Sequence, residues 1–570
     1  MKNSLMKILK VSFTIILLIA FQHKIFAQSL PVGTVGLEDY YRRAQLLGEA
    51  DSSVSFMIRP IFPKLAFKTK DVFYEDSTEK RTNLANISPM IYRSKSGKLN
   101  VSFLPFSIQT QLNSDHPYGW NDGAMIPAKG FQTLISGGIY LEYGILSIQF
   151  KPEFDYAVNS EFSTWNPATY GITTAKYYDF YNNIDLPARF GTNQYSKAFW
   201  GQSSILLNYK AVSFGLSTEN LWWGPGIQNS LLMSNTAPGF KHLTLNTRKP
   251  IKTAVGSFEG QIIAGRLENS GYGVLTPEVD YFSNPLYITK PNDSRYISGI
   301  VATWQPKWIP GLFLGLTRSS QLYTKDLSKL GDYFPFFSST TKFNADQPLN
   351  KSDNRSSVFM RWLWPEEHAE IYFEYGKNNS TGDLLSQALE PAKNRAYIFG
   401  LRKMVPFNKS RNENILISIE ATQLQETNPT DIANASSWYV NKYVRQGYTN
   451  SGQELGAGIG PGGNLQTLDV SWVKGLKKLG FQLQRYLHNN DFYFYAYTSD
   501  QDARRHWTDL SVAFTGEWNY KNFIFNAKLM EVKSLNYQWY LFEPPTGTVV
   551  WVNGANAFNT QLQAGITYRF

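Results

Sequence analysis

The 570-residue chain contains no cysteine. This absence excludes a disulfide scaffold, a thiolate metal site and a cysteine nucleophile. Histidine is scarce as well, at 6 residues, and no two histidines stand three or four positions apart. Because metal-binding helices need that spacing, as in HExxH, the sequence predicts no metal site and no cofactor.

Long apolar runs are also missing. The run from Val11 to Phe21 is too short for a membrane helix, which needs roughly 18 apolar residues, and no later segment reaches that length. This run follows Lys2, Lys7 and Lys10 and precedes Ala27. The arrangement is typical of a secretory signal peptide, here residues 1–27, with cleavage after Ala27. We therefore expect an exported protein without a helical anchor.

Aromatic residues are abundant although the average hydropathy is modest. They make up 15% of the chain, with 34 Tyr, 38 Phe and 15 Trp, while the mean hydropathy is -0.31. This combination suits a barrel wall, where every second residue meets lipid and aromatics gather at the interfaces. Removing the four Lys of residues 1–27 from the formal charge of +10 leaves +6. That mild excess is compatible with an acidic glycan or lipopolysaccharide partner, and nothing resembles a nucleic-acid module.

Apolar and polar side chains alternate from Phe558 to Phe570, with Thr560 as the exception on the apolar face. One face carries Phe558, Leu562, Ala564, Ile566, Tyr568 and Phe570, and the other carries Asn559, Gln561, Gln563, Gly565, Thr567 and Arg569. Such a period of two predicts a β-strand with one side toward lipid and the other toward water. The chain ends on Phe570, which resembles the assembly signal of bacterial outer-membrane barrels and implies the barrel assembly machinery as a partner. The last strand of a soluble sandwich is the alternative.

Segments of about ten residues recur from Leu99 onward, the length that a tilted strand needs to cross the hydrocarbon. Their connectors alternate between short and long, as in barrels with short periplasmic turns and long outer loops. We therefore predict an all-β fold, a transmembrane outer-membrane β-barrel of about 18 antiparallel strands over residues 99–570. The expected strands are 99–111, 130–143, 145–156, 202–209, 211–220, 240–249, 255–268, 295–305, 311–321, 355–364, 368–377, 395–405, 413–424, 466–474, 479–487, 507–518, 523–534 and 558–570.

Residues 28–98 do not show this alternation. Between Gly36 and Gly48, apolar side chains fall at helical spacing, Glu38 and Asp39 stand in the first turn, and Gly48 is placed to end a helix. The stretch 75–83 is charged and polar. We expect a small periplasmic segment with one short amphipathic helix, which could lie under the barrel or enter its lumen as a plug.

Motifs for catalysis are weak. His506 near Asp509 is the best candidate for a hydrolase, but no serine is singled out as its nucleophile. Glu366-Glu367-His368 suits a solvated turn. The stretch 458–463 contains GxGxxG, yet Pro461 interrupts it and no helix follows, so an external glycine-rich loop is the better interpretation. We predict no catalytic residues and no enzymatic activity.

The segment Glu219-Asn220-Leu221-Trp222-Trp223-Gly224-Pro225-Gly226 is the most unusual in the chain. Paired Trp rings can offer flat faces to sugar rings, with Asn220 and Glu219 available to hydroxyl groups. Alternatively the Trp pair belongs to the interfacial aromatic belt or packs its loop into the lumen.

Three stretches resemble the Wzi capsule-assembly family of outer-membrane proteins. They are 117–123 (PYGWNDG) with Lys129-Gly130, 201–240 through ENLWWGPG to SNTAPGF, and 447–464 (GYTNSGQELG through GGN). The resemblance implies an eighteen-stranded barrel with a helical periplasmic element, and a surface lectin that holds capsular polysaccharide. It does not imply an enzyme.

The leading hypothesis is a non-enzymatic outer-membrane protein that assembles or retains surface polysaccharide through its external loops. The residues expected to contact sugar, or to support the loops that do, are Trp222, Trp223, Asn220 and Glu219, followed by Trp120, Asn121 and Asp122. A porin-like diffusion channel is the main alternative. An outer-membrane hydrolase and a soluble secreted β-protein are further alternatives.

Overall fold

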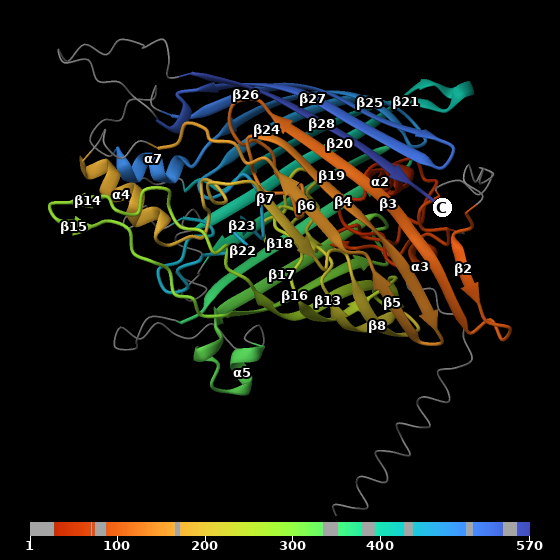
Figure 1. The fold of residues 1–570 in the computed structure, drawn as a ribbon. Coiled ribbons are helices and arrows are strands. Elements are labelled where there is room, and N and C mark those ends of the chain that lie inside the picture. The colour runs from red at the N-terminus through yellow and green to blue at the C-terminus, as the bar shows by residue number, and fades with distance from the viewer. Residues whose placement is uncertain are drawn as a thin grey trace, which may run out of the picture.

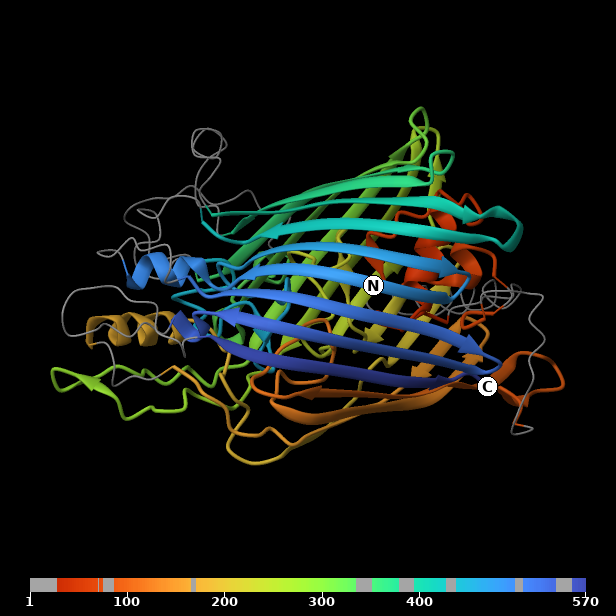
Figure 2. The same cartoon turned by 90° about the horizontal axis from the view of Figure 1, so that it is seen from above.

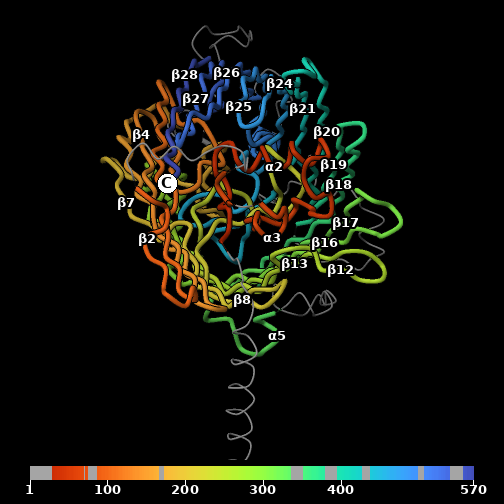
Figure 3. Tube along the Cα trace, turned by 90° about the vertical axis from the view of Figure 1, so that its right-hand side faces the viewer, coloured from red at the N-terminus to blue at the C-terminus, as the bar shows by residue number. Residues whose placement is uncertain are grey.

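The protein is a closed antiparallel β-barrel of 18 strands, seen from the side in Figure 1 and from one end in Figure 3. The computed structural model describes residues 28–69, 71–74, 87–165, 171–334, 351–378, 394–426, 437–497, 506–539 and 556–570. The predicted signal peptide, residues 1–27, and the polar stretch 75–83 lie outside the described residues. Within the described ranges, no helix is both long enough and apolar enough to cross a membrane.

The barrel closes where the last strand pairs with the first, from Tyr568 opposite Phe106 to Gln561 opposite Asn113. Three wall strands are interrupted and carry two labels each: β5 with β6, β7 with β8, and β11 with β12. The wall consists of β3 (Leu99–Asn113), β4 (Gly130–Tyr143), β5 (Leu146–Phe150), β6 (Glu153–Ala157), β7 (Tyr195–Phe199), β8 (Ser204–Tyr209), β9 (Val212–Ser217), β11 (His242–Thr247), β12 (Ile251–Thr253), β13 (Gly256–Leu267), β16 (Arg295–Pro306), β17 (Leu312–Tyr323), β18 (Asp353–Trp364), β19 (Ala369–Asn378), β20 (Arg395–Asn408), β21 (Glu413–Gln423), β24 (Asn464–Lys474), β25 (Lys477–Leu487), β26 (Thr508–Tyr520), β27 (Phe523–Leu535) and β28 (Ala557–Tyr568).

Each predicted strand coincides with a wall strand, so the predicted fold class is confirmed. Sequence analysis missed the elements outside the wall, apart from the N-terminal helix. These elements are α2 (Leu37–Leu46), β1 (Ile58–Arg59), α3 (Pro63–Ala66), β2 (Met90–Arg93), α4 (Gly171–Tyr181), β10 (Trp222–Trp223), β14 (Asp280–Tyr281), β15 (Asn284–Pro285), α5 (Leu330–Tyr333), β22 (Thr449–Asn450), β23 (Gln453–Glu454), α7 (Asn490–Ala496) and the single 3-10 turns Thr324–Asp326, Lys409–Arg411 and Tyr537–Trp539.

The two faces of the wall differ as the alternation predicts. In β26, Leu510, Val512 and Phe514 are exposed on the outside. Asp509 and Ser511, on the opposite face, are buried in the barrel. Because the outer face carries a broad apolar surface and the inner face is polar, the wall is suited to lipid outside and to polar contacts inside.

The two ends of the barrel are unlike. At one end, hairpins close in tight turns, and Lys210 and Lys521 adopt φ of 51° and 52° there. The C-terminus lies at this end (Figures 1 and 2), which we call the turn end. At the opposite end, the loop end, α4, α7 and the β14–β15 hairpin project beyond the wall (Figure 1).

The N-terminal residues lie within the ring of strands near the turn end (Figure 3). Helix α2 forms where the sequence predicts it, between Gly36 and Gly48, whose φ values of 75° and 72° suit glycine at both helix ends. Its buried side packs with Phe56, Ile61 and Ala66 of α3 in an apolar cluster that reaches wall residues such as Leu104 and Ile524. The segment therefore contacts the inside of the wall.

The lipid-facing assignment of the wall can be tested on one strand. Phe514→Lys places a charge on the outer face of β26, so it should lower the free energy of unfolding in lipid bilayers by about 2–4 kcal/mol. Gln563→Lys is the matched control, because its side chain faces Asp122 in the lumen and should cost less. Urea titration followed by the gel shift of folded barrels measures both, and an equal cost on the two faces would contradict the assignment.

Candidate functional site

The Trp pair lies inside the barrel. Residues 218–241, here called the inner loop, connect β9 to β11, and their β10 pairs with β1 of the N-terminal segment, Trp223 opposite Ile58. Trp223 is fully buried, and its Nε1 donates to Oε1 of Gln261 on β13 at 2.9 Å. A Cβ at Gly299 of β16 would lie 2.8 Å from the indole, so glycine leaves room for the ring there.

Trp222 contacts the N-terminal segment through its ring. The Arg59 guanidinium lies over its ring, 4.2 Å from the centroid, and Arg59 also pairs with Glu38 of α2 at 2.6 Å. Such a cation–π contact is worth roughly 2 kcal/mol when it is desolvated. Trp222 is buried like its neighbour. The Trp222 ring therefore contacts the N-terminal segment and the Trp223 ring contacts the wall, so both pack inside the barrel.

Glu219 and Asn220 are buried in the same region. Asn220 receives a hydrogen bond from Gln202 at 3.0 Å and donates to Asn235 at 2.7 Å. Glu219 accepts hydrogen bonds from Ser29 and from Gln149, the latter at 3.1 Å. Their hydrogen-bonding groups are used inside the protein, so the proposed sugar contacts of these two residues stay a prediction.

The tip of the inner loop is fixed to the far wall by one carboxylate. Glu420 of β21 accepts hydrogen bonds from the backbone N–H groups of Ile227, Gln228 and Asn229 at 2.7, 3.0 and 3.0 Å. The Tyr372 hydroxyl donates to it as well, at 2.8 Å. Because Glu420 stands on the opposite side of the barrel from β9 and β11, the inner loop crosses the lumen.

The stretch 120–122 also folds inward. Asn121, at φ 63°, donates from its side chain to the backbone oxygen of Gln228 at 2.6 Å. Trp120 packs 5.7 Å from the ring of Tyr486. Burial raises the pKa of Asp122 to about 6, although Lys528 and a hydrogen bond from Gln563 act in the opposite direction. This group therefore belongs to the lumen rather than to the outermost loops.

The third resembling stretch meets the other two. Ser234 of the inner loop donates from its backbone to the oxygen of Leu455 at 2.8 Å. Asn235 accepts from the backbone N–H of Gly123 at 2.8 Å. A Cβ at Gly458 would lie 2.4 Å from Cβ of Trp120. All three stretches that resemble the Wzi family therefore converge on one packed region in the lumen.

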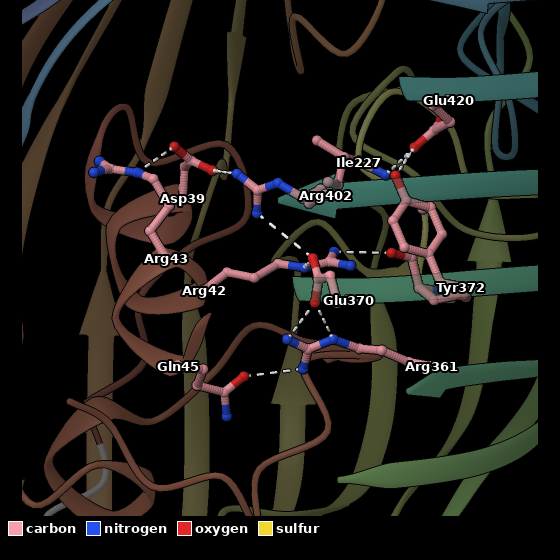
Figure 4. A network of polar contacts seen from close by, with 12 residues as sticks. Asp39, Arg42, Arg43, Gln45, Ile227, Arg361, Glu370, Tyr372, Arg402 and Glu420 are labelled. Atoms are coloured by element: carbon pink, nitrogen blue, oxygen red, sulfur yellow. Dashed lines mark hydrogen bonds and ion pairs between the residues drawn. The ribbon is translucent and has the colours of Figure 1, made fainter. Parts of the chain in front are cut away.

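A network of charges fixes α2 to the wall (Figure 4). Glu370 of β19 pairs with Arg42 at 2.8 Å and with Arg361 of β18 at 2.6 Å, and Arg402 of β20 lies 3.7 Å away. Arg402 also pairs with Asp39 of α2 at 2.6 Å. Glu370 and the three arginines are buried. Sequence analysis missed this network, whose only signal is charged residues on the inward face of strands.

Asp39 balances the arginine side of this network. Burial alone would raise its pKa, but Arg402 and Arg43 outweigh that effect and hold the pKa well below its usual value. The Asp39 carboxylate therefore stays charged at neutral pH, and α2 stays paired with the wall.

The loop end is built from aromatic residues. Helices α4 and α7 lie side by side there (Figures 1 and 2), and Lys176 of α4 donates to the Tyr495 backbone oxygen at 2.9 Å. Trp165 stacks on Tyr177 at 4.9 Å. Burial raises the pKa of Asp491 to about 7. The crevice beside these rings holds about 30 Å³, too little for a sugar ring.

The histidines show no accessible catalytic arrangement in the described ranges. Asp509 pairs with His488 at 2.6 Å, whereas His506 contacts Asn490, so the weak hydrolase candidate of His506 with Asp509 is not formed. Ser534 lies 3.4 Å from His116, which contacts the adjacent Asp115. Ser534 is fully buried, and His116 nearly so, which leaves no path for a substrate. No cluster of three metal-binding side chains occurs among the described residues.

Comparison with known proteins identifies the family. Residues 139–522, well over half of the chain, match the family model described as "Capsule assembly protein Wzi". The chain belongs to the Wzi capsule-assembly family. A search of curated proteins finds no match.

The fold agrees with that of a solved Wzi. The structure of Wzi from Escherichia coli, described as a carbohydrate-binding β-barrel involved in group 1 capsule assembly, has 13% identity and a TM-score of 0.52, with 82% of this chain and 84% of that chain covered. OccAB2 from Acinetobacter baumannii has 9% identity, covers 81% and 97% of the two chains, and has a TM-score of 0.39. This Wzi-family member is an outer-membrane barrel, and the three stretches that resemble the family pack together in its lumen.

The charge network predicts how the N-terminal segment can be loosened. Glu370→Gln leaves Arg42, Arg361 and Arg402 without their shared carboxylate, and unpaired buried charges cost about 3–5 kcal/mol. We expect residues 28–74 to become sensitive to protease while the barrel itself stays folded, as measured by limited proteolysis and mass spectrometry. Glu531→Gln is the control, because Glu531 is exposed and contacts Thr560. Equal protection of both variants would refute the role of the network.

Proposed function

We propose that this Wzi-family protein is a non-enzymatic outer-membrane protein that binds surface polysaccharide at its loop end and helps to assemble or retain it as capsule. The family match over residues 139–522 carries this proposal. The carbohydrate-binding description of the Wzi from Escherichia coli, whose fold this chain shares, supports it. The chemistry required by this proposal is binding alone.

The β14–β15 hairpin is the best candidate for a sugar contact. Its two-residue turn holds Phe282 and Ser283 at φ 51° and 62°. Turns of this type normally use Asn-Gly, and a bulky aromatic side chain in that region is uncommon. Phe282 is 82% exposed and lies 4.5 Å from the ring of Tyr281. A strained turn that presents an aromatic ring to solvent suggests a binding role, here against the apolar face of a sugar.

The earlier candidates take a supporting role in this proposal. Trp222, Trp223, Asn220 and Glu219 are buried, and Asn121, between Trp120 and Asp122, hydrogen-bonds to the same inner loop. We infer that these seven residues position the loops that contact glycan rather than contacting it themselves.

The lumen contents argue against an open diffusion channel. The N-terminal segment and the inner loop meet inside the barrel through β1 and β10. Glu420 and Glu370 hold the inner loop and α2, respectively, against the wall. We infer that residues 28–98 form a periplasmic segment that plugs the barrel 99–570, and that the protein shows no steady conductance in planar bilayers. An outer-membrane hydrolase remains the weaker alternative, since Ser534 is buried.

The envelope supplies the remaining partners. The exposed apolar wall suits membrane lipid and lipopolysaccharide. We propose that a signal peptide, residues 1–27, directs export and that the barrel assembly machinery recognises the end of the chain. In the folded barrel, the Phe570 ring stacks on Phe103 at 4.8 Å.

Deletion of the protein tests the function directly. In a capsulated strain that carries it, deletion should move polysaccharide from the cell surface into the medium without lowering the total, because retention rather than synthesis is lost. A uronic-acid or sugar assay of the two fractions measures the partition. Unchanged retention would remove the proposed function.

Phe282→Ala tests the contact surface. We expect binding of fluorescently labelled polysaccharide to fall about tenfold, the loss typical of one well-packed aromatic contact of about 1.4 kcal/mol, while folding is unchanged. Phe407→Ala is the matched control, because Phe407 is 68% exposed but lies where β20 reaches the turn end. If both variants bind the polysaccharide equally well, the hairpin is not the contact surface.

A further inference from the structure

A cavity of about 200 Å³ lies in the lumen, separate from the loop end. The N-terminal stretch Pro31–Val35 forms one side, and Asn121–Gly123 with Asn235 forms another. The wall strands β3, β4, β27 and β28 complete it through inward residues such as Gln109 and Gln563. Pockets for drug-sized ligands hold about 300–1,000 Å³, so this one suits a smaller molecule.

Carboxamide side chains dominate the polar lining. They come from six strand or loop segments that the barrel brings together, and they are Gln109, Gln111, Asn121, Gln202, Asn235, Asn526 and Gln563. A carboxamide offers both donors and an acceptor, which is what neighbouring hydroxyl groups require, since each hydroxyl donates once and accepts. Burying a hydroxyl without such partners is costly.

Apolar side chains occupy the rest of the lining. Val32, Phe73, Pro105, Met125 and Leu134 contribute surfaces without hydrogen-bonding groups. An apolar floor combined with a few convergent polar groups is the usual make-up of small-molecule sites. A pyranose ring has this same division, with C–H groups on its faces and hydroxyl groups around its edge.

Two polar groups of the lining have hydrogen-bonding capacity that the described residues do not use. Lys151 lies between β5 and β6, and its ammonium makes no hydrogen bond or ion pair with any residue that the structure describes, although the carboxylates of Glu153, also in the lining, and Glu219 attract it electrostatically. Gln111 is 5% exposed; its Nε2 donates to Tyr118, but its Oε1 has no partner there. A lysine ammonium carries three donors, and the Lys151 side chain is only partly buried. These groups therefore have hydrogen-bonding capacity left for a ligand.

We propose that this lumenal cavity binds a single pyranose unit, with Lys151 donating to a ring hydroxyl or carboxylate oxygen and the carboxamides binding its other hydroxyls. The site deepens the proposed function and rests on it for its biological meaning, but it is physically distinct from the loop-end hairpin. The two sites share no residue, so each can be removed alone.

The test uses the full mature chain, purified in a detergent without a sugar headgroup. Glucose, galactose and glucuronate are the probes, and saturation-transfer NMR measures their binding. We expect transfer to at least one probe, and about a tenfold weaker affinity for Lys151→Met, as for the loss of one hydrogen bond from a charged group. Lys252→Met is the control, because Lys252 is exposed on β12, and its affinity should equal that of the unchanged protein.

A second variant tests whether a loss of probe binding is due to misfolding. Gln111→Leu keeps the side-chain volume and should also weaken probe binding, while the gel shift of folded barrels reports that each variant is intact. Absence of transfer from all three probes, or equal affinity of Lys151→Met and Lys252→Met, would overturn the proposal. Phe282→Ala should retain probe binding. If the probes bind but deletion leaves capsule retention normal, the cavity site is supported and the proposed function fails. If no probe binds but deletion lowers capsule retention, the cavity site fails and the proposed function is supported.

Discussion

The structure depends on one constraint: within lipid, every backbone N–H and C=O group must be paired inside the protein. A sheet meets this constraint only when it closes, and here closure is the pairing of β28 with β3. Closure with 18 strands has a geometric consequence, because barrels of about this size enclose a lumen too wide for wall side chains to fill. The chain must therefore either leave a channel or supply other segments to fill it. The N-terminal segment and the inner loop are those segments.

The segments that fill the lumen are held in place by contacts that differ from those in the core of a soluble protein. The inward face of the wall is polar, so segments that enter the lumen must satisfy hydrogen-bonding groups on that face. Glu420 accepts three backbone N–H groups of the inner loop, and Glu370 joins Arg42 to the wall. Buried ion pairs contribute little net stability, since desolvation offsets their attraction, yet removing one partner is costly. Such contacts therefore fix where the filling sits more than how stable the barrel is.

This division explains what the sequence could predict. Wall strands follow a local period of two, so each can be found from its own residues, and all of them were. The lumenal contacts join residues far apart in the chain, such as Arg42 and Glu370 at a separation of 328 positions, and no local pattern identifies such partners. Trp222 and Trp223 were ambiguous because flat aromatic rings suit both a sugar platform and a packed interior. The sequence could not show their burial or their pairing with β1, because that partner lies far away in the chain. Proximity in sequence misled once, since Asp509 pairs with His488 across two strands and not with the nearby His506.

The location of the family motifs bears on how recognition can vary within the family. The three resembling stretches meet in the lumen, where glycine at positions such as 299 and 458 is required by close packing. Residues under that constraint cannot change freely, whereas the exposed hairpin around Phe282 touches little else. A barrel of this kind can therefore keep its wall and filling while its loop end changes to suit a different polysaccharide. On this argument, the lumenal stretches belong to the scaffold, and the exposed loop end is where the proposed sugar specificity can vary.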